Sequence, residues 1–159
     1  MAGLKLEIIQ DPPFASPEEE ALLNLMRTSD VLHRAFHLKT RSWGITSTQY
    51  NVLRILRGAH PNGLTCSAIG SRMITAEPDI TRLLARLKTL KLIHQRRDRH
   101  DRRVLWTHIA PAGLELLRQM DPTIERIPIE LLGHLSRADL SKLIALLEQA
   151  RTRCADEKA

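Results

Sequence analysis

Hydrophobic residues recur three and four positions apart along most of this chain, a spacing that places them on one face of an α-helix. The first stretch begins at Ser16-Pro17, where Ser16 can cap a helix, Pro17 suits its first position and Glu19 can close a capping box. It runs to about Arg41, and its apolar stripe consists of Ala21, Leu22, Leu25, Met26, Leu32, Ala35 and Phe36. Such a long helix with one apolar stripe needs a partner to cover it.

Two shorter helices are expected next. A second capping box, in Thr46-Ser47-Thr48-Gln49, opens a helix that ends at Gly58. Thr65 then caps a short helix from Cys66 to about Arg72, and Pro61-Asn62-Gly63 makes the turn between the two.

The following helix is predicted to start at Thr75, with Pro78 in its first turn. Its apolar face consists of Ile80, Leu83, Leu84, Leu87 and Leu90. Glu77 and Asp79 would then place two carboxylates in the first turn, where they suit the helix dipole but oppose phosphates. Capping is favoured for them, and acceptance of a hydrogen bond from a cytosine amino group is the alternative.

The hydrophobic period changes after this helix. Leu92–Arg97 and Val104–Ile109 are typical of two short strands, with Asp98–Arg102 as the loop between them. Pro111 opens another helix, for which Pro122 and Pro128 predict kinks or a break. A last helix, capped at Ser136-Arg137-Ala138-Asp139, carries Leu140, Leu143, Ile144, Leu146 and Leu147. The pattern predicts a mainly α fold with a small β-hairpin.

Composition places the chain among ordinary globular proteins. Its 159 residues fit one compact domain, or one domain with an added dimerisation arm, and 43% are hydrophobic. No apolar run approaches the ~18 residues of a membrane span, and Met1–Phe14 lacks the features of a signal peptide. Cys66 and Cys154 are too few and too far apart for a disulfide framework or a structural zinc site. We expect a soluble, cytoplasmic protein with no membrane partner.

The positive charge is concentrated in one segment. Residues 82–103 hold nine Lys or Arg and two Asp, a net charge of +7, whereas the whole chain carries +6. The other 137 residues therefore carry −1. A polyanion is the natural partner, because clustered Lys and Arg release condensed counterions from phosphate. The alternative is a solvated charged face with no binding function. An anionic membrane is less favoured as a partner because the segment is not one basic amphipathic helix.

A short helix, a turn, a second helix and then a hairpin with a basic tip form the winged helix-turn-helix arrangement. The second helix of such a pair fits the major groove of B-DNA, and base edges are read from its N-terminal part. Arg-rich hairpin tips can reach the adjacent minor groove, where narrow A·T tracts concentrate negative potential.

Four segments of this region resemble known sequence motifs. Leu64–Ile69 is similar to an "LT-x-x-x-L" helix, and Asp79–Leu87 resembles a "TRLLDRLE" recognition helix. Arg97–Arg103 is similar to an "R-x-x-x-D-x-R" wing, and Ile109–Gly113 to the "LTPAG" that follows it. Together these segments resemble the MarR family of bacterial transcriptional regulators, and the order of elements matches from about Glu18 to Arg151.

The resemblance implies a domain plan and a mode of action. A lead-in at 1–15 precedes a helical dimerisation region built from 16–44 and 111–155, and 45–110 forms the winged helix-turn-helix DNA-binding region. The family implies a homodimer that binds a pseudo-palindromic operator, usually as a repressor. Many members release DNA when a small, often phenolic or otherwise anionic, effector enters a cleft between the two regions. The apolar stripes of the first and last helices support the dimer independently.

Two positions depart from the family pattern. Lys91 stands where a glycine usually ends the recognition helix, and a left-handed conformation there would cost roughly 1 kcal/mol. Ala110 replaces the Thr that usually caps the next helix, a cap worth about 1 kcal/mol.

The residues expected to contact DNA are Thr65, Ser67, Asp79, Thr81, Arg82, Arg86, Arg97, Arg99, Asp101, Arg102 and Arg103. Asp101 is expected to orient Arg103 or a neighbour through a carboxylate–guanidinium pair, while Arg99 or Arg102 reaches the minor groove. A solvated turn is the bland alternative for this tip. Arg86 is equally explained by a salt bridge or a phosphate contact, and Thr65 by capping.

His33 and His37 lie four residues apart on the first helix and so share one face. A zinc site is not favoured, because no acidic or cysteine ligand stands beside them. In the family's pocket region they would instead meet an effector together with Trp43, for which packing is the favoured role. Cys66 is expected to be an inert thiol. No metal or cofactor is predicted.

The sequence therefore predicts a sequence-specific DNA-binding transcriptional regulator, with activator or repressor left open by the residues themselves. A non-specific or architectural DNA-binding protein, or a winged-helix protein-interaction module, is the alternative. An enzyme is not expected, because the chain has no glycine-rich phosphate loop, no orderable Ser-His-Asp or Cys-His set and no H-E-x-x-H motif.

Overall fold

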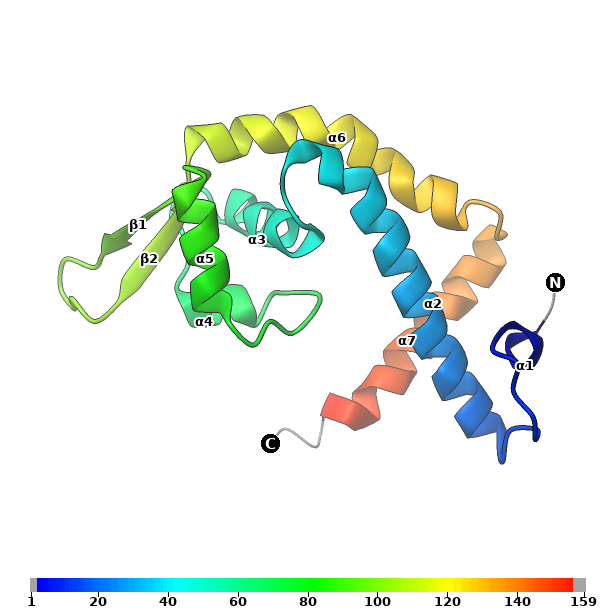
Figure 1. Ribbon diagram of the computed structural model, residues 1–159. Helices are drawn as coiled ribbons and strands as arrows, with labels where there is room; N and C mark the ends of the chain where they lie inside the picture. The colour runs from blue at the N-terminus through cyan, green and yellow to red at the C-terminus, as the bar shows by residue number, and fades with distance from the viewer. Residues whose placement is uncertain (1–2, 156–159) are drawn as a thin grey trace. The chain divides into compact units, whose positions relative to one another are not determined.

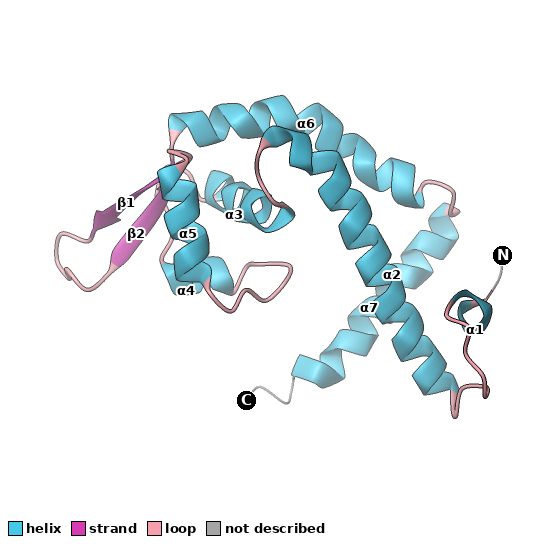
Figure 2. Cartoon of the chain, viewed as in Figure 1, coloured by secondary structure: helices cyan, strands magenta, loops and turns pink. Residues whose placement is uncertain are grey.

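The computed structural model describes the backbone of residues 3–155 and the side chains of residues 3–152, so the side chain of Cys154 lies outside it. Its elements, in chain order, are α1 (Leu4–Glu7), α2 (Pro17–Thr40), the 3₁₀ turn η1 (Arg41–Trp43), α3 (Ser47–Gly58), α4 (Cys66–Gly70), α5 (Ile80–Thr89), β1 (Ile93–Arg97), β2 (Leu105–Ile109), α6 (Pro111–Leu132) and α7 (Arg137–Ala155). Figures 1 and 2 show these helices and the single hairpin. The expected fold class, mainly α with a small β-hairpin, is confirmed.

The chain divides into two compact units, residues 1–121 and 122–159, and α6 runs through the boundary. This division concerns compactness alone, so the expected DNA-binding and dimerisation regions stay predictions. Within the described residues no helix is both long enough and apolar enough to cross a membrane.

Side-chain caps set the starts of α2 and α3 where the sequence predicts them. Ser16 accepts a hydrogen bond from the Glu19 N–H, and Thr46 and Gln49 form the complete reciprocal box at α3. A capping box would have the Glu19 carboxylate accept from the N–H of Ser16. It accepts instead from the Ala15 N–H at 2.6 Å, one residue before the cap.

The expected start of the recognition helix at Thr75 is wrong, because α5 begins only at Ile80. Pro78 has no N–H to donate and disfavours helical backbone at Glu77 before it. The Asp79 carboxylate then caps the helix by accepting from the Arg82 N–H at 2.8 Å. Residues 71–79 therefore form a loop, and Pro78 and Glu77 lie in it rather than in a first turn.

The core of the first unit joins the helix-turn-helix to the hairpin. Its completely buried apolar side chains are Val52, Leu53 and Leu56 of α3, Ile69 of α4, Leu87 of α5, and Leu117 and Met120 of α6. Arg57 of α3 pairs with Asp121, because its Nη1 donates to both carboxylate oxygens at 2.9 Å. Apolar burial and this pair fix α3 against the first part of α6.

The hairpin pairs β1 and β2 antiparallel, with Ile93 opposite Ile109 and Arg97 opposite Leu105. Leu64 forms an isolated antiparallel bridge with Thr107 of β2, through reciprocal backbone hydrogen bonds of 2.9 and 2.8 Å. The loop between α3 and α4 is therefore attached to the base of the hairpin.

Kinks or a break were expected at Pro122 and Pro128, and the break does not occur, since α6 continues through both prolines. Each proline removes only one backbone donor, and the turns on either side keep their own hydrogen bonds. In the second unit, Ser136 caps α7 by accepting from the Asp139 N–H at 3.1 Å.

Candidate nucleic-acid interface

Helix α5 presents a broad exposed face opposite its buried leucines. Leu83, Leu84 and Leu87 point into the core. The exposed residues are Thr81, Arg82, Ala85, Arg86, Lys88 and Thr89. The guanidinium groups of Arg82 and Arg86 make no hydrogen bond or ion pair with other described residues, which leaves both cations available to an anionic partner. In Figure 1, α5 lies beside the hairpin, so one surface carries both elements.

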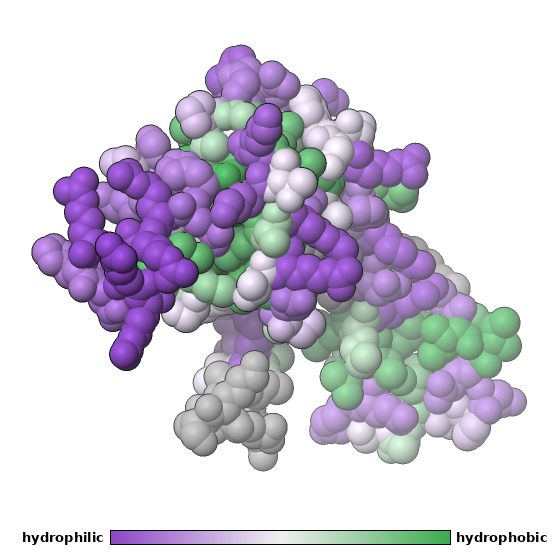
Figure 3. All heavy atoms as spheres, turned by 60° about the vertical axis from the view of Figure 1, so that its left-hand side comes forward, coloured by the Kyte–Doolittle hydropathy of each residue, from purple (hydrophilic) through white to green (hydrophobic). Residues whose placement is uncertain are grey.

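The hairpin tip carries a second group of unengaged cations. Arg99, Arg102 and Arg103 are exposed, and within the described part of the chain no acceptor holds their guanidinium groups. The view in Figure 3 turns this side of the molecule forward and shows strongly hydrophilic side chains over it. Arg97 is different, because its guanidinium donates to the Arg102 carbonyl at 2.6 Å and so helps to build the tip.

Asp98 organises the tip, a role that the sequence prediction missed. One carboxylate oxygen accepts from the backbone N–H groups of His100 and Asp101 at 2.8 and 3.0 Å. The other accepts from the Trp106 indole N–H at 3.0 Å. These donors, first the Asp101 amide, then His100 and Trp106, hold the pKa of Asp98 below its usual value. An Asp at the start of a turn commonly accepts from the amides that follow it, so the position of Asp98 at the start of the predicted loop was the signal in the sequence.

The expected pairing of Asp101 with an arginine side chain is wrong. The Asp101 carboxylate accepts from the backbone N–H of Arg103 at 2.9 Å rather than from a guanidinium. A carboxylate two residues before an amide closes a local turn more readily than it reaches a long flexible side chain. Asp101 therefore orients Arg103 through its main chain.

Capping accounts for two of the other predicted contacts. Thr65 caps α4 by accepting from the Ala68 N–H at 3.3 Å, and Asp79 caps α5. Ser67 is exposed and lies 3.3 Å from the Thr65 hydroxyl. Thr81 is exposed on α5. Contact with DNA stays a prediction for each of these residues.

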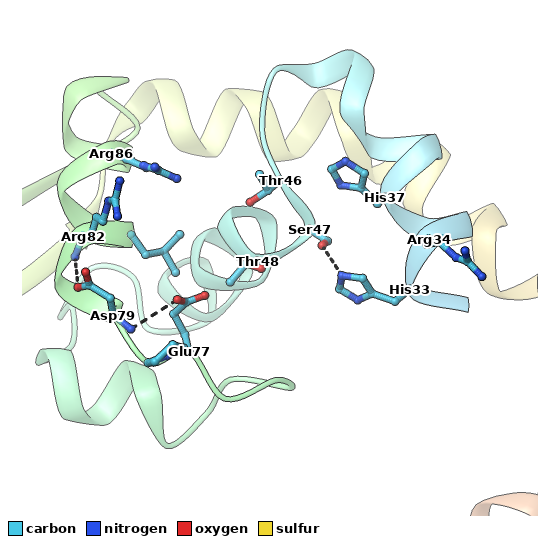
Figure 4. Close-up of a pocket in the computed structure, with 12 residues that line it drawn as sticks. His33, Arg34, His37, Thr46, Ser47, Thr48, Glu77, Asp79, Arg82 and Arg86 are labelled. Atoms are coloured by element: carbon cyan, nitrogen blue, oxygen red, sulfur yellow. Dashed lines mark hydrogen bonds between the residues drawn. The ribbon is translucent and has the colours of Figure 1, made fainter. Parts of the chain in front are cut away.

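A cleft of about 640 Å³ lies behind the cationic edge of α5. His33, Arg34 and His37 of α2 form one wall. Figure 4 shows residues from three other segments facing the helix: Thr46, Ser47 and Thr48 around the start of α3, Glu77 and Asp79 in the loop, and Arg82 and Arg86 of α5. Pro78 and Leu83 also line the cleft. His33 lies 3.4 Å from the Ser47 hydroxyl. Arg82 and Arg86 therefore belong to both the cleft and the outer face of α5.

The structure brings together two of the three residues expected at an effector site. His33 and His37 line the cleft, whereas the half-buried Trp43 does not. Trp43 belongs to η1, which turns the chain between α2 and α3. Within the described residues, no three or more His, Cys, Asp or Glu side chains gather in a group that could hold a metal ion.

Comparison with known proteins gives consistent matches. The MarR family model matches residues 43–104. A MarR transcription factor of known structure from Planctomyces limnophilus is 36% identical, over 86% of this chain and 99% of that one, with a TM-score of 0.66. The HTH-type transcriptional regulator YkoM of Bacillus subtilis is 26% identical over 144 residues, which cover 86% of this chain and 90% of YkoM.

A third relative shares the fold at lower identity. BpsR of Bordetella bronchiseptica, whose DNA binding is regulated by 6-hydroxynicotinic acid, is 23% identical. The match covers 89% of this chain and 99% of BpsR, with a TM-score of 0.76.

A recognition helix with free cations beside an arginine-tipped hairpin defines a winged helix-turn-helix DNA-binding protein. The 36% identity extends over almost the whole of the relative from P. limnophilus. The chain belongs to the MarR family. It is a DNA-binding transcription regulator and not an enzyme.

Proposed function

We propose that this protein represses transcription by binding a pseudo-palindromic operator as a homodimer. The observation that carries the proposal is the single surface formed by α5 and the hairpin tip, where Arg82, Arg86, Arg99, Arg102 and Arg103 are exposed. Two separated cationic elements match a major groove and its adjacent minor groove better than they match a flat anionic surface. A dimer would present this surface twice, as two half-sites require.

Uncovered apolar side chains support the dimer. In the first unit, α2 exposes Leu22, Leu25, Met26 and Val31, with between 40% and 61% of each accessible. In the second unit, Ile129, Ile144 and Leu146 are more than half exposed. Apolar surface repeated along helices in this way is typical of an interface, and a second copy of the chain is the occupant that a two-fold operator calls for.

The cleft supports regulation by a small anionic effector. Its cations include Arg82 and Arg86, which also face the proposed DNA surface, so a bound anion would compete with DNA for them. BpsR, whose DNA binding a small aromatic carboxylic acid regulates, shares the fold. His33 and His37 would contact the effector, whereas Trp43 would not, because it does not line the cleft.

The test is fluorescence anisotropy with the duplex upstream of the protein's own gene and a scrambled duplex of equal length, each at two salt concentrations. We expect a preference of about a thousandfold or more for the native duplex. Equal binding to both duplexes, steeply weakened by salt, would overturn the proposal in favour of an architectural DNA-binding protein. Absence of binding to either would favour a protein-interaction module.

A further inference from the structure

The exposed face of α5 is divided between two kinds of side chain. Arg82 and Arg86 lie on the edge that lines the cleft. Thr81, Ala85 and Thr89, each four residues from the next, do not line that cleft. This second row lines a separate groove of about 460 Å³ between α5, α4 and the hairpin.

The chemistry of this groove is mainly that of methyl groups. Ala85 offers only its methyl, and the Thr89 hydroxyl donates to the Ala85 carbonyl at 3.1 Å, so the Thr89 methyl is what remains to contact a partner. Leu105 of β2 lines the groove and is 40% exposed. Lys88 supplies the only formal charge among the lining residues, which are Cys66, Thr81, Leu84, Ala85, Lys88, Thr89, Gln95 and Leu105.

We propose that the row Thr81–Ala85 reads thymine 5-methyl groups in the major groove, with Thr89 extending the same apolar contact toward the end of the helix. The inference rests on the proposed operator binding and adds the chemistry of its bases. The thymine methyl is the apolar feature of the major-groove edge, and alanine and threonine methyl groups are suitable contacts for it. Arg82, one position from Thr81, would meet a guanine or a phosphate beside that thymine.

The position of the row within the helix supports this assignment. Thr81 and Ala85 belong to the N-terminal six residues of α5, the part from which recognition helices read base edges. Leu83 and Leu87 point into the core, and Leu84 forms the buried side of the groove, whereas Thr81 and Ala85 are exposed in it. Flanking cations would hold the DNA phosphates while the methyl row contacts the bases.

The experiment uses two preparations of the native upstream duplex, one synthesised with dTTP and one with dUTP. They present the same hydrogen-bonding edges and differ in the 5-methyl group. Removal of one buried methyl contact should weaken binding about fourfold, and loss of one in each half-site about fifteenfold. Anisotropy titrations of the full-length protein at one salt concentration measure this ratio.

Two substitutions assign the ratio to the row. Thr81→Ser removes only a methyl, and Ala85→Ser places a hydroxyl on the row, so each should bring the ratio of the two affinities toward one. Arg102→Ala is the matched control, because it should weaken binding to both duplexes equally and leave the ratio unchanged. Circular dichroism melting confirms that each variant is folded.

The possible results distinguish methyl reading, its assignment to this row and the operator proposal. Equal affinity of the wild type for the two preparations, with the preference over scrambled DNA retained, would overturn methyl reading and leave the operator proposal intact. A methyl preference that survives in both serine variants would overturn its assignment to this row. Failure to prefer native over scrambled DNA would overturn the operator proposal and this inference together.

Discussion

Asp98 orders the hairpin tip that we propose binds DNA. Its carboxylate accepts hydrogen bonds from two tip amides and from the Trp106 indole. Asp98→Ala removes all three bonds, so the tip arginines must be ordered at the moment of binding. We expect the Kd for the native duplex to rise about tenfold while the melting temperature changes little, because the tip is exposed.

Asp98→Asn is the control for this prediction. It keeps an oxygen that can accept the amide hydrogen bonds, and it should therefore restore much of the affinity in the same anisotropy titration. An alanine variant that binds as tightly as the wild type would show that the turn forms without the carboxylate.

His94 gives a prediction about how the stability of the fold depends on pH. Its ring stacks on His108 across the hairpin, with ring centroids 5.1 Å apart and planes 9° apart. Partial burial, then the neighbouring His108 and Arg96, lower the pKa of His94. The folded state therefore disfavours the imidazolium, so this contribution to stability is present above the unfolded pKa of about 6.5 and is lost as the pH falls below it.

His94→Gln should accordingly reduce the fall in melting temperature between pH 7.5 and pH 5. Differential scanning fluorimetry of the wild type and the variant at both pH values measures this change. His134→Gln, at an exposed position of the second unit, is the control and should leave the fall as it is. If both variants behave as the wild type does, the stacked pair does not contribute.

Whole elements were predictable where a local signal decided them. Ser16, Thr46 and Thr65 each cap the helix that the sequence assigns to them, because a cap needs only an oxygen and an amide three residues away. The start of α5 was misplaced by five residues, since Pro78 and Asp79 override the apolar pattern before Ile80.

The site was predictable in part for the same reason. The charge run identified the tip arginines and the exposed face of α5. The Asp98–Trp106 bond, the cleft behind Arg82 and Arg86 and the methyl-lined groove depend on segments that meet only in the folded chain. The hydrophobic periodicity of one helix carries no information about contacts between segments that are distant in the sequence.

The end of α5 gives a prediction at the scale of an element. Lys91, identified from the sequence as a departure from a usual glycine, adopts the left-handed conformation, with φ of 58°. Lys91→Gly should raise the free energy of unfolding by roughly 1 kcal/mol, because glycine adopts this conformation without steric cost. Urea titration should show a higher midpoint with an unchanged slope. Lys91→Ala is the control: it removes the charge but keeps the Cβ, and it should give no such gain.

At the scale of the molecule, the exposed apolar residues and the divided surface of α5 argue for the proposed homodimer, in which two recognition helices are joined. A single recognition helix reads a few base pairs, and specificity against a genome needs two such readings joined rigidly. The apolar residues of α2 and of the second unit are suited to that joining, and the cleft beside α2 would let an effector change how the DNA-reading surfaces are held.

Disrupting the proposed dimer interface should therefore weaken both dimerisation and operator binding. Leu22 is 57% exposed in one copy, and Leu22→Glu would bury an unpaired charge in the proposed interface. Sedimentation velocity at micromolar concentration should give a dimer for the wild type and a monomer for the variant, with operator affinity reduced at least about a hundredfold. Ile74→Glu, at a 78% exposed position of the loop before α5, should remain dimeric. A wild-type monomer would contradict the homodimer, and a dimeric Leu22→Glu protein would place its interface on other residues.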